Sequence, residues 1–229
     1  MDTKNEIFGL AAGDVAAEAP PRRCQMKLAV FAALAVWLGV DAFLGLQGAF
    51  VGGPEAPPWR LLLGLAIPLA LFFAGYSGWK EFRGFILGAD IRLVGAIEGW
   101  RWAGLGFLSL YAHGILPGLF AFPAGLGDMA VGLTAPWIVL GLVRDPSLAG
   151  SRRFVLWNVF GILDLVVAVS LGALCSGFFH GINGLIGGVT TRAVTQLPLV
   201  FIPTYLVPFF LMLHATALFQ ARQRARAGR

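Results

Sequence analysis

The chain has 229 residues, of which 58% are hydrophobic and 13% are charged, and its mean hydropathy is +0.78. Soluble domains are about 45–50% apolar and about 25% charged, so this composition excludes an ordinary soluble globular domain. The formal net charge of +5 could suggest nucleic-acid binding. However, the basic residues lie at the ends of apolar segments and form no continuous stripe, so we expect no nucleic-acid partner.

Six apolar segments follow a polar beginning. Residues 1–26 are mixed in character and predict a flexible tail. A helix needs about 20 apolar residues to cross a bilayer. By this measure we expect spans at about 28–51, 60–79, 100–118, 119–143, 154–175 and 197–219. The predicted fold is an all-α bundle of six transmembrane helices within one domain, residues 27–221, followed by a basic tail at 222–229.

Two connecting segments have a character of their own. Residues 80–99 are charged but carry apolar residues at helical spacing, which indicates an amphipathic helix lying along the membrane surface. Trp100 and Trp102 then flank Arg101, a pattern typical of the interface at the start of a span. Residues 176–196 are rich in glycine and too broken to span, so they predict a surface or re-entrant loop.

The distribution of basic residues predicts the orientation. With the N-terminus in the cytoplasm, 15 of the 17 lysines and arginines fall in cytoplasmic segments, and only Arg60 and Arg192 fall outside. This asymmetry agrees with the positive-inside rule. We therefore expect a protein of the cytoplasmic (inner) membrane with both termini in the cytoplasm.

Five ionisable residues lie within the expected spans: Asp41, His113, Asp128, Asp164 and His214. An ionisable side chain inside the bilayer costs about 2.5–3.5 kcal/mol on insertion scales, so each one needs a reason. Heights can be counted at about 1.5 Å per residue from the nearest cytoplasmic basic residue. His113 lies 12 residues from Arg101, and His214 lies 8 residues from Arg222. The count places His214 nearer the cytoplasm and the other four in one layer just beyond the middle.

The three aspartates share a local pattern, because each is followed four positions later by a glycine or an alanine. A small residue on the same helical face allows a neighbouring helix to approach closely. Each aspartate is therefore expected to face another helix. Two interpretations stay open: a hydrogen bond that holds the bundle together, or a buried carboxylate that takes up a proton or a cation.

The beginning of the fourth span predicts an interrupted helix. Pro123, Gly125 and Gly127 precede Asp128, and broken backbone at membrane depth is tolerated mainly where it lines a cavity. We expect Asp128 and Asp164 to form a solute or ion site, with Asp41 and His113 as further contributors.

The leading hypothesis is a secondary transporter or channel-like protein for a small solute or cation, with no cofactor. The chain lacks the H-E-x-x-H, G-x-S-x-G, Walker and C-x-x-C motifs, so we do not expect an enzyme of those classes. One alternative is a haem or metal redox protein that uses His113 and His214 as ligands. Another is a non-catalytic subunit of a larger membrane complex. The expected partners are the lipid bilayer and further copies or subunits.

Overall fold

The computed structural model describes residues 22–53, 56–180 and 187–227, and all regular structure within these ranges is helical. The elements are α1 (Arg22–Leu46), α2 (Trp59–Gly78), α3 (Lys80–Leu87), α4 (Ile91–Ile97), the 3-10 helix η1 (Glu98–Gly104), α5 (Leu105–Ala112), α6 (Gly118–Arg144), the 3-10 helix η2 (Pro146–Gly150), α7 (Arg152–Leu174), the 3-10 helix η4 (Thr191–Thr195), the π-helix η5 (Ile202–Leu206) and α8 (Val207–Ala227). Most of the expected tail, residues 1–21, and residues 181–186 of the expected loop lie outside the described residues.

Among the described residues, five helices are long and apolar enough to cross a membrane: Cys24–Leu46, Trp59–Gly78, Gly118–Arg144, Arg152–Leu174 and Ile202–Arg226. They identify the chain as a membrane protein and correspond to five of the six expected spans. The span expected at 100–118 does not form one continuous helix. Its place is taken by α4, η1 and α5 in succession, after which the chain turns at 113–117 into α6.

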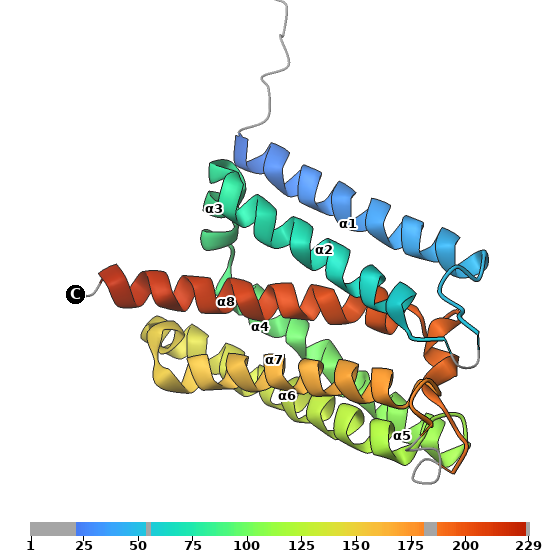
Figure 1. Cartoon of the computed structure of the whole chain (residues 1–229). Helices are drawn as coiled ribbons and strands as arrows, with labels where there is room; N and C mark the ends of the chain where they lie inside the picture. The colour runs from blue at the N-terminus through green and yellow to red at the C-terminus, as the bar shows by residue number, and fades with distance from the viewer. Residues whose placement is uncertain (1–21, 54–55, 181–186, 228–229) are drawn as a thin grey trace, which may run out of the picture.

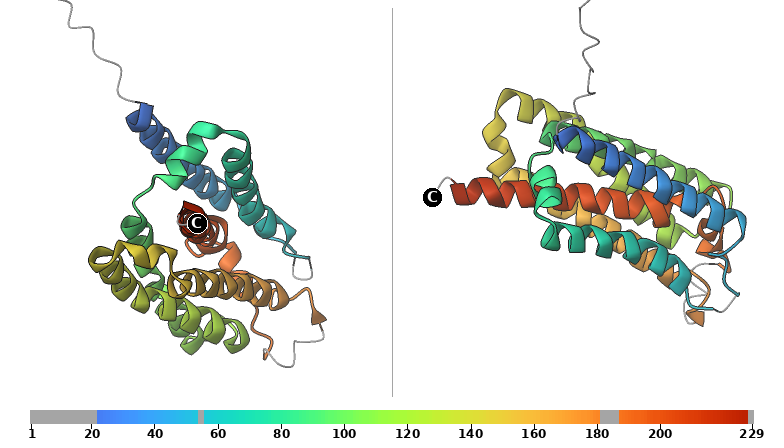
Figure 2. Two further views of the ribbon diagram at one scale, coloured as in Figure 1. Left: turned by 90° about the vertical axis from the view of Figure 1, so that its left-hand side faces the viewer. Right: turned by 90° about the horizontal axis from the view of Figure 1, so that it is seen from above.

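The long helices run along a common axis with α8 in the middle (Figures 1 and 2). Helices α1, α2 and α3 lie on one side of α8, and α4 to α7 lie on the other side. The start of α1, helix α3, the α6–α7 connection and the end of α8 all lie at one end of the bundle (Figure 1). We call this end the basic end, because these elements carry Lys27, Lys80, Arg144, Arg152 and Arg222. The other end is called the opposite end.

Polar caps explain the sharp turn between α6 and α7 at the basic end. The Asp145 side chain accepts a hydrogen bond of 2.9 Å from the backbone N–H of Ser147 and thereby starts η2. The Ser151 hydroxyl accepts one of 3.2 Å from the backbone N–H of Phe154 and caps α7. Such caps satisfy the free donors of a helix start, so two antiparallel helices can follow each other closely.

The segment at 80–99 forms two helices rather than the single interfacial helix expected. Helix α3 covers the basic end and packs Ile86 in one cluster with Phe72 of α2. After a bend, α4 enters the bundle, where its Ile91 packs in a cluster that also contains Leu142 of α6. The helical segment that takes the place of the span expected at 100–118 thus begins at Ile91, nine residues earlier than the sequence indicated.

Candidate functional site

The 3-10 helix η1 lies between α4 and α5 and directs charged side chains inward. A 3-10 helix has three residues per turn, so side chains three apart lie above one another. Glu98, Arg101 and Gly104 accordingly share one face, and all three are buried. Trp100 and Trp102 point away and are 73% and 52% exposed. The expected position of Arg101 at a membrane interface is therefore wrong, because its guanidinium lies inside the bundle with 2% exposure.

Glycines allow η1 to lie directly against α6. A Cβ atom on Gly104 would lie 2.5 Å from the Asp128 Cβ and 2.9 Å from the Gly125 carbonyl oxygen. A Cβ on Gly132 would overlap the backbone of Trp102. Contacts this close exclude any larger residue at these positions. The backbone of η1 is thereby fixed at the depth of Asp128.

Arg101 is the centre of a network that joins three helices. Its Nε donates to Asp128 Oδ1 of α6 at 2.7 Å, and its Nη2 donates to Asp164 Oδ2 of α7. Its Nη1 donates to the Gly161 carbonyl oxygen at 3.3 Å and lies 2.9 Å from His214 Nε2 of α8. Charge-assisted hydrogen bonds of this kind are the strong ones. Each of these four contacts uses one N–H group, so four of the five guanidinium N–H groups are occupied.

Two further glycines make room for these side chains. A Cβ on Gly127 would overlap the Asp164 carboxylate, and a Cβ on Gly161 would overlap the His214 imidazole. Because both glycines face polar groups, their small size serves the charged network as well as helix packing.

Helix α6 contains no interruption. It is helical from Gly118 to Arg144 and runs through Pro123, Gly125 and Gly127, so the break expected there is absent. A proline removes only one backbone donor, and the hydrogen bonds on either side keep the helix continuous. The break in this region of the bundle lies instead in η1, on the neighbouring segment.

His214 is fully buried and held in one tautomer. Asn158 Nδ2 donates to the Phe154 carbonyl oxygen at 2.9 Å, so Asn158 Oδ1 is left as the acceptor for His214 Nδ1 at 3.0 Å. The imidazole proton is therefore on Nδ1, and Nε2 accepts from Arg101. The residue count along the helix predicted that His214 lies nearer the cytoplasm than the aspartates, but His214 contacts Arg101 at their level.

Glu98 is the residue that the sequence analysis missed. It is 1% exposed, and its Oε2 lies 3.3 Å from His214 Nε2 and 3.8 Å from Arg101 Nη1. Neither carboxyl oxygen has a hydrogen-bond partner among the described residues. The i, i+3 spacing of Glu98 and Arg101, with Gly99 and Gly104 close by, was the available signal, but Glu98 stood in a segment interpreted as interfacial.

We call Glu98, Arg101, Asp128, Asp164 and His214 the Arg101 cluster. It contains three carboxyl groups and one guanidinium, so with a neutral imidazole and all carboxyls ionised its formal charge would be −2. Burying uncompensated charge is costly. Such a cluster can lower its energy by binding protons or a cation.

Two of the predicted site residues lie elsewhere. His113 is exposed at the end of α5, where its Nδ1 donates to the Ser109 carbonyl oxygen at 2.8 Å. It is 12 residues beyond Arg101, about 18 Å along a helix axis. His113 and His214 are therefore not brought together as a ligand pair. Among the described residues, no group of three or more His, Cys, Asp or Glu side chains is placed to hold a metal ion.

Asp41 forms a second buried polar site between α1 and η5. Its side chain is within hydrogen-bonding reach of Trp37 and of Thr204 on the π-helix, and its Oδ2 has no partner among the described residues. The Tyr205 hydroxyl donates to the Leu34 carbonyl oxygen at 3.4 Å. Single π-turns occur frequently at functional sites, but this one is separate from the Arg101 cluster.

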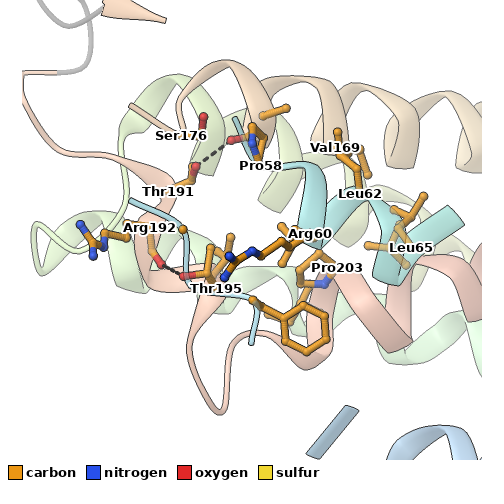
Figure 3. A pocket seen from close by; sticks show the side chains of 18 of the residues that line it. Pro58, Arg60, Leu62, Leu65, Val169, Ser176, Thr191, Arg192, Thr195 and Pro203 are labelled. Atoms are coloured by element: carbon orange, nitrogen blue, oxygen red, sulfur yellow. Dashed lines mark hydrogen bonds between the residues drawn. The ribbon is translucent and has the colours of Figure 1, made fainter. Parts of the chain in front are cut away.

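Two cavities border the cluster, and Asp128 lines both. The first has a volume of about 150 Å³ and is mainly apolar. It extends from the opposite end, where Arg60, Arg192 and Thr195 lie, to Asp128. Figure 3 shows the Arg60 side chain reaching across this pocket towards Thr195. The guanidinium of Arg60 also donates to the Val51 carbonyl oxygen at 3.1 Å.

The second cavity has a volume of about 330 Å³ and lies between η1 and η5. Its lining includes Arg101, Asp128, Tyr205 and Phe210. The Arg101 guanidinium carbon lies 5.8 Å from the centre of the Phe210 ring, which is a favourable cation–π distance. Asp128 is the only cluster residue that faces both cavities within the part of the chain that the structure describes.

The helices and the buried network define an α-helical membrane protein with an ion-paired polar centre. The chain belongs to the family described as a domain of unknown function, DUF8737, whose model matches residues 58–222. This range contains the whole Arg101 cluster and leaves out α1 with Asp41. Comparisons with curated proteins and with solved structures find no match.

Proposed function

We propose that the protein is a secondary transporter or channel-like protein that moves a small solute or cation and uses the carboxyl groups of the Arg101 cluster. One observation carries this proposal. Three carboxyl groups share one guanidinium in the middle of the bundle, and a cavity reaches Asp128 from the opposite end. Ionisable groups at membrane depth commonly mark substrate paths and proton relays.

The exposure of the cluster supports a pathway through Asp128. The side chains of Asp128 and Asp164 are 17% and 7% exposed, whereas those of Glu98 and Arg101 are 1% and 0% exposed. Asp128, which lines both cavities, is thus the carboxyl group of the cluster that a solute, a cation or water in the cavities can reach. Binding of a cation at Asp128 would compete with its hydrogen bond to Arg101, which links occupancy of the site to the packing of η1.

The proposal includes a sixth crossing segment made of α4, η1 and α5. At about 1.5 Å per residue in the α-helices and about 2.0 Å in the 3-10 helix, these 22 residues extend about 37 Å. That length exceeds the hydrocarbon thickness of about 30 Å. Interrupted helices at midplane binding sites are a recurrent feature of transporters. Six crossings would return the C-terminus to the side where α1 begins.

The proposed orientation places the basic end in the cytoplasm. With Arg101 inside the bundle, 14 of the 17 basic residues belong to cytoplasmic segments, and Arg60 and Arg192 remain on the outer side. The asymmetry still agrees with the positive-inside rule. The cavity that reaches Asp128 would then open outward.

The direct test is ion flux in liposomes of phosphatidylethanolamine and phosphatidylglycerol that contain the purified protein and the pH dye pyranine. Na⁺, K⁺, a small amine and a monocarboxylate are added one at a time, and the internal pH and ²²Na⁺ uptake are followed. We expect at least one probe to produce a flux above that of protein-free vesicles. Asp128→Asn and Asp164→Asn should abolish it, whereas the exposed control Asp145→Asn should retain it.

Two outcomes would contradict the proposal: no flux with any probe, or full flux in the Asp128→Asn/Asp164→Asn double variant. In the second case the aspartates would only hold the bundle together. Stable co-purification with another membrane protein would then favour the role of a non-catalytic subunit.

The cavity can be tested separately from the charges. Ala168 of α7 lines the first cavity, whereas its neighbour Val167 is 46% exposed on the surface of the bundle. Ala168→Phe should fill the cavity and stop the flux, and Val167→Phe is the matched control that should leave it unchanged. Equal flux in both variants would exclude this cavity as the route.

A further inference from the structure

The pairing of Arg101 with two aspartates leaves Glu98 unexplained. Arg101 directs its hydrogen bonds to Asp128, Asp164, the α7 backbone and His214, and its closest approach to Glu98 is 3.8 Å. A carboxylate that is 1% exposed and receives no hydrogen bond from the part of the chain that the structure describes would be strongly unfavourable. The protonation state of Glu98 is therefore the point to resolve.

The contacts of His214 resolve it. The hydrogen bond between Nδ1 and Asn158 Oδ1 places the imidazole proton on Nδ1. The lone pair of Nε2 then faces both Arg101 Nη1 at 2.9 Å and Glu98 Oε2 at 3.3 Å. An ionised Glu98 would place two acceptors against each other, and an imidazolium would direct an N–H at the guanidinium. A protonated Glu98 removes both conflicts, because its O–H shares the single lone pair of Nε2 with the Arg101 N–H in a bifurcated hydrogen bond.

We propose that Glu98 and His214 hold one proton between them inside the bundle and form the proton-binding site of the protein. The proton resides on the Glu98 carboxyl group and is directed at His214 Nε2. The other charged groups around the pair are Arg101 on η1, Asp128 on α6 and Asp164 on α7. With this proton bound, the remaining net charge of −1 lies on the two aspartates, which are the more exposed carboxyls of the cluster.

The position of Arg101 also selects the kind of cation. A metal cation bound by Glu98 and His214 would lie within a few ångströms of the guanidinium and be repelled by it. A proton is bound covalently by one of the two groups and needs no shell of ligands. The inference thus names the proton as the coupling ion, and in that respect alone it rests on the proposed function.

The test is infrared spectroscopy of the full-length protein in lipid, in H₂O and in D₂O. A protonated carboxyl group gives a C=O stretching band that an ionised one lacks. We expect such a band in the wild type, its loss in Glu98→Gln and its retention in Glu81→Gln, a control at an exposed glutamate of α3. Glutamine has the size and neutrality of the protonated side chain, so Glu98→Gln should fold with an unchanged melting temperature.

A second measurement keeps Glu98 intact. The chain has three histidines, so a His113→Gln/His180→Gln variant purified through a histidine-free tag reports His214 alone in ¹⁵N NMR. We expect Nδ1 to carry a proton and Nε2 to be an unprotonated acceptor at neutral pH. Two protonated nitrogens, or a wild type without a Glu98-dependent band, would overturn the proposal.

These readouts separate the inference from the proposed function. A Glu98-dependent band in a protein that transports none of the probes would refute the transport role alone. Flux that depends on Asp128, in a protein with an ionised Glu98, would refute the inference alone. If both hold, Glu98→Gln should abolish proton-driven accumulation of the solute, whereas the exposed control Glu81→Gln should retain it.

Discussion

Replacing Arg101 should cause the largest loss of stability of any single change in the cluster. Arg101→Gln removes the partner of both Asp128 and Asp164 and leaves two buried carboxylates uncompensated. Breaking one buried ion pair by removing a partner costs about 3–5 kcal/mol. Because Arg101 is 2% exposed and water cannot replace it fully, we expect Arg101→Gln to lie at or above the upper end of this range.

The loss of stability in Arg101→Gln should depend on pH. It should also be recovered when the charges of the two aspartates are removed as well. The unpaired aspartates of the variant can relieve their cost by binding protons, whereas in the wild type the neighbouring guanidinium favours their ionised form. The native variant therefore binds more protons than the native wild type, and the difference in stability should narrow as the pH falls from neutral towards about 5. Arg101→Gln/Asp128→Asn/Asp164→Asn removes the charges together and should recover most of the stability.

The assay is the free energy of unfolding from titration with dodecyl sulfate in mixed micelles, followed by tryptophan fluorescence. The exposed Arg153→Gln variant is the control and should stay within about 0.5 kcal/mol of the wild type. The reasoning would be refuted if Arg101→Gln unfolded at the wild-type detergent concentration. It would also be refuted if the triple variant were less stable than Arg101→Gln.

Two smaller predictions concern a glycine and a cap. Gly161→Ala should cost about 1–3 kcal/mol, since its Cβ would overlap the His214 ring, while Gly106→Ala, which meets no atom within 4 Å, should be neutral or stabilising in the same unfolding assay. Hydrogen bonds from Arg92 hold the pKa of Asp90 below its ordinary value of 3.8, so this cap stabilises α4 above that value and loses its effect as the pH falls through the lowered pKa. A ¹³C titration of the carboxyl group checks this, and a pKa at or above 3.8 would contradict it.

Composition and apolar length sufficed to predict the class of fold. An uninterrupted stretch such as 154–175 has few ways to satisfy its backbone in a bilayer other than as a helix, and α7 occupies almost that range. The structure of the segment from α4 to α5 could not be predicted in the same way. An arginine between two tryptophans is typical of an interface, and nothing local distinguishes that pattern from a 3-10 segment whose arginine finds two aspartates more than 25 residues away.

The heights of the histidines were wrong because their reference points were wrong. His113 was counted from Arg101, which lies inside the bundle rather than at its basic end. His214 was counted from Arg222 as if the membrane ended there, but α8 continues to Ala227. Asp128 and Asp164 were counted from arginines at helix ends and are found together. Depth along a helix can thus be predicted only when the chosen reference residue lies at the end of the bundle.

Glu98 distinguishes a functional cluster from a structural one. A structural role would be fulfilled by Arg101 and the two aspartates, which join η1, α6 and α7 through strong hydrogen bonds. A third carboxyl group adds excess negative charge to a buried site, and an apolar residue of similar size would be more favourable there. Glu98 lies against the acceptor nitrogen of His214. It can form a favourable contact with this nitrogen only if it carries a proton. A group that must be protonated to be tolerated, beside an aspartate that lines two cavities, is the arrangement that the proposed proton-coupled site requires.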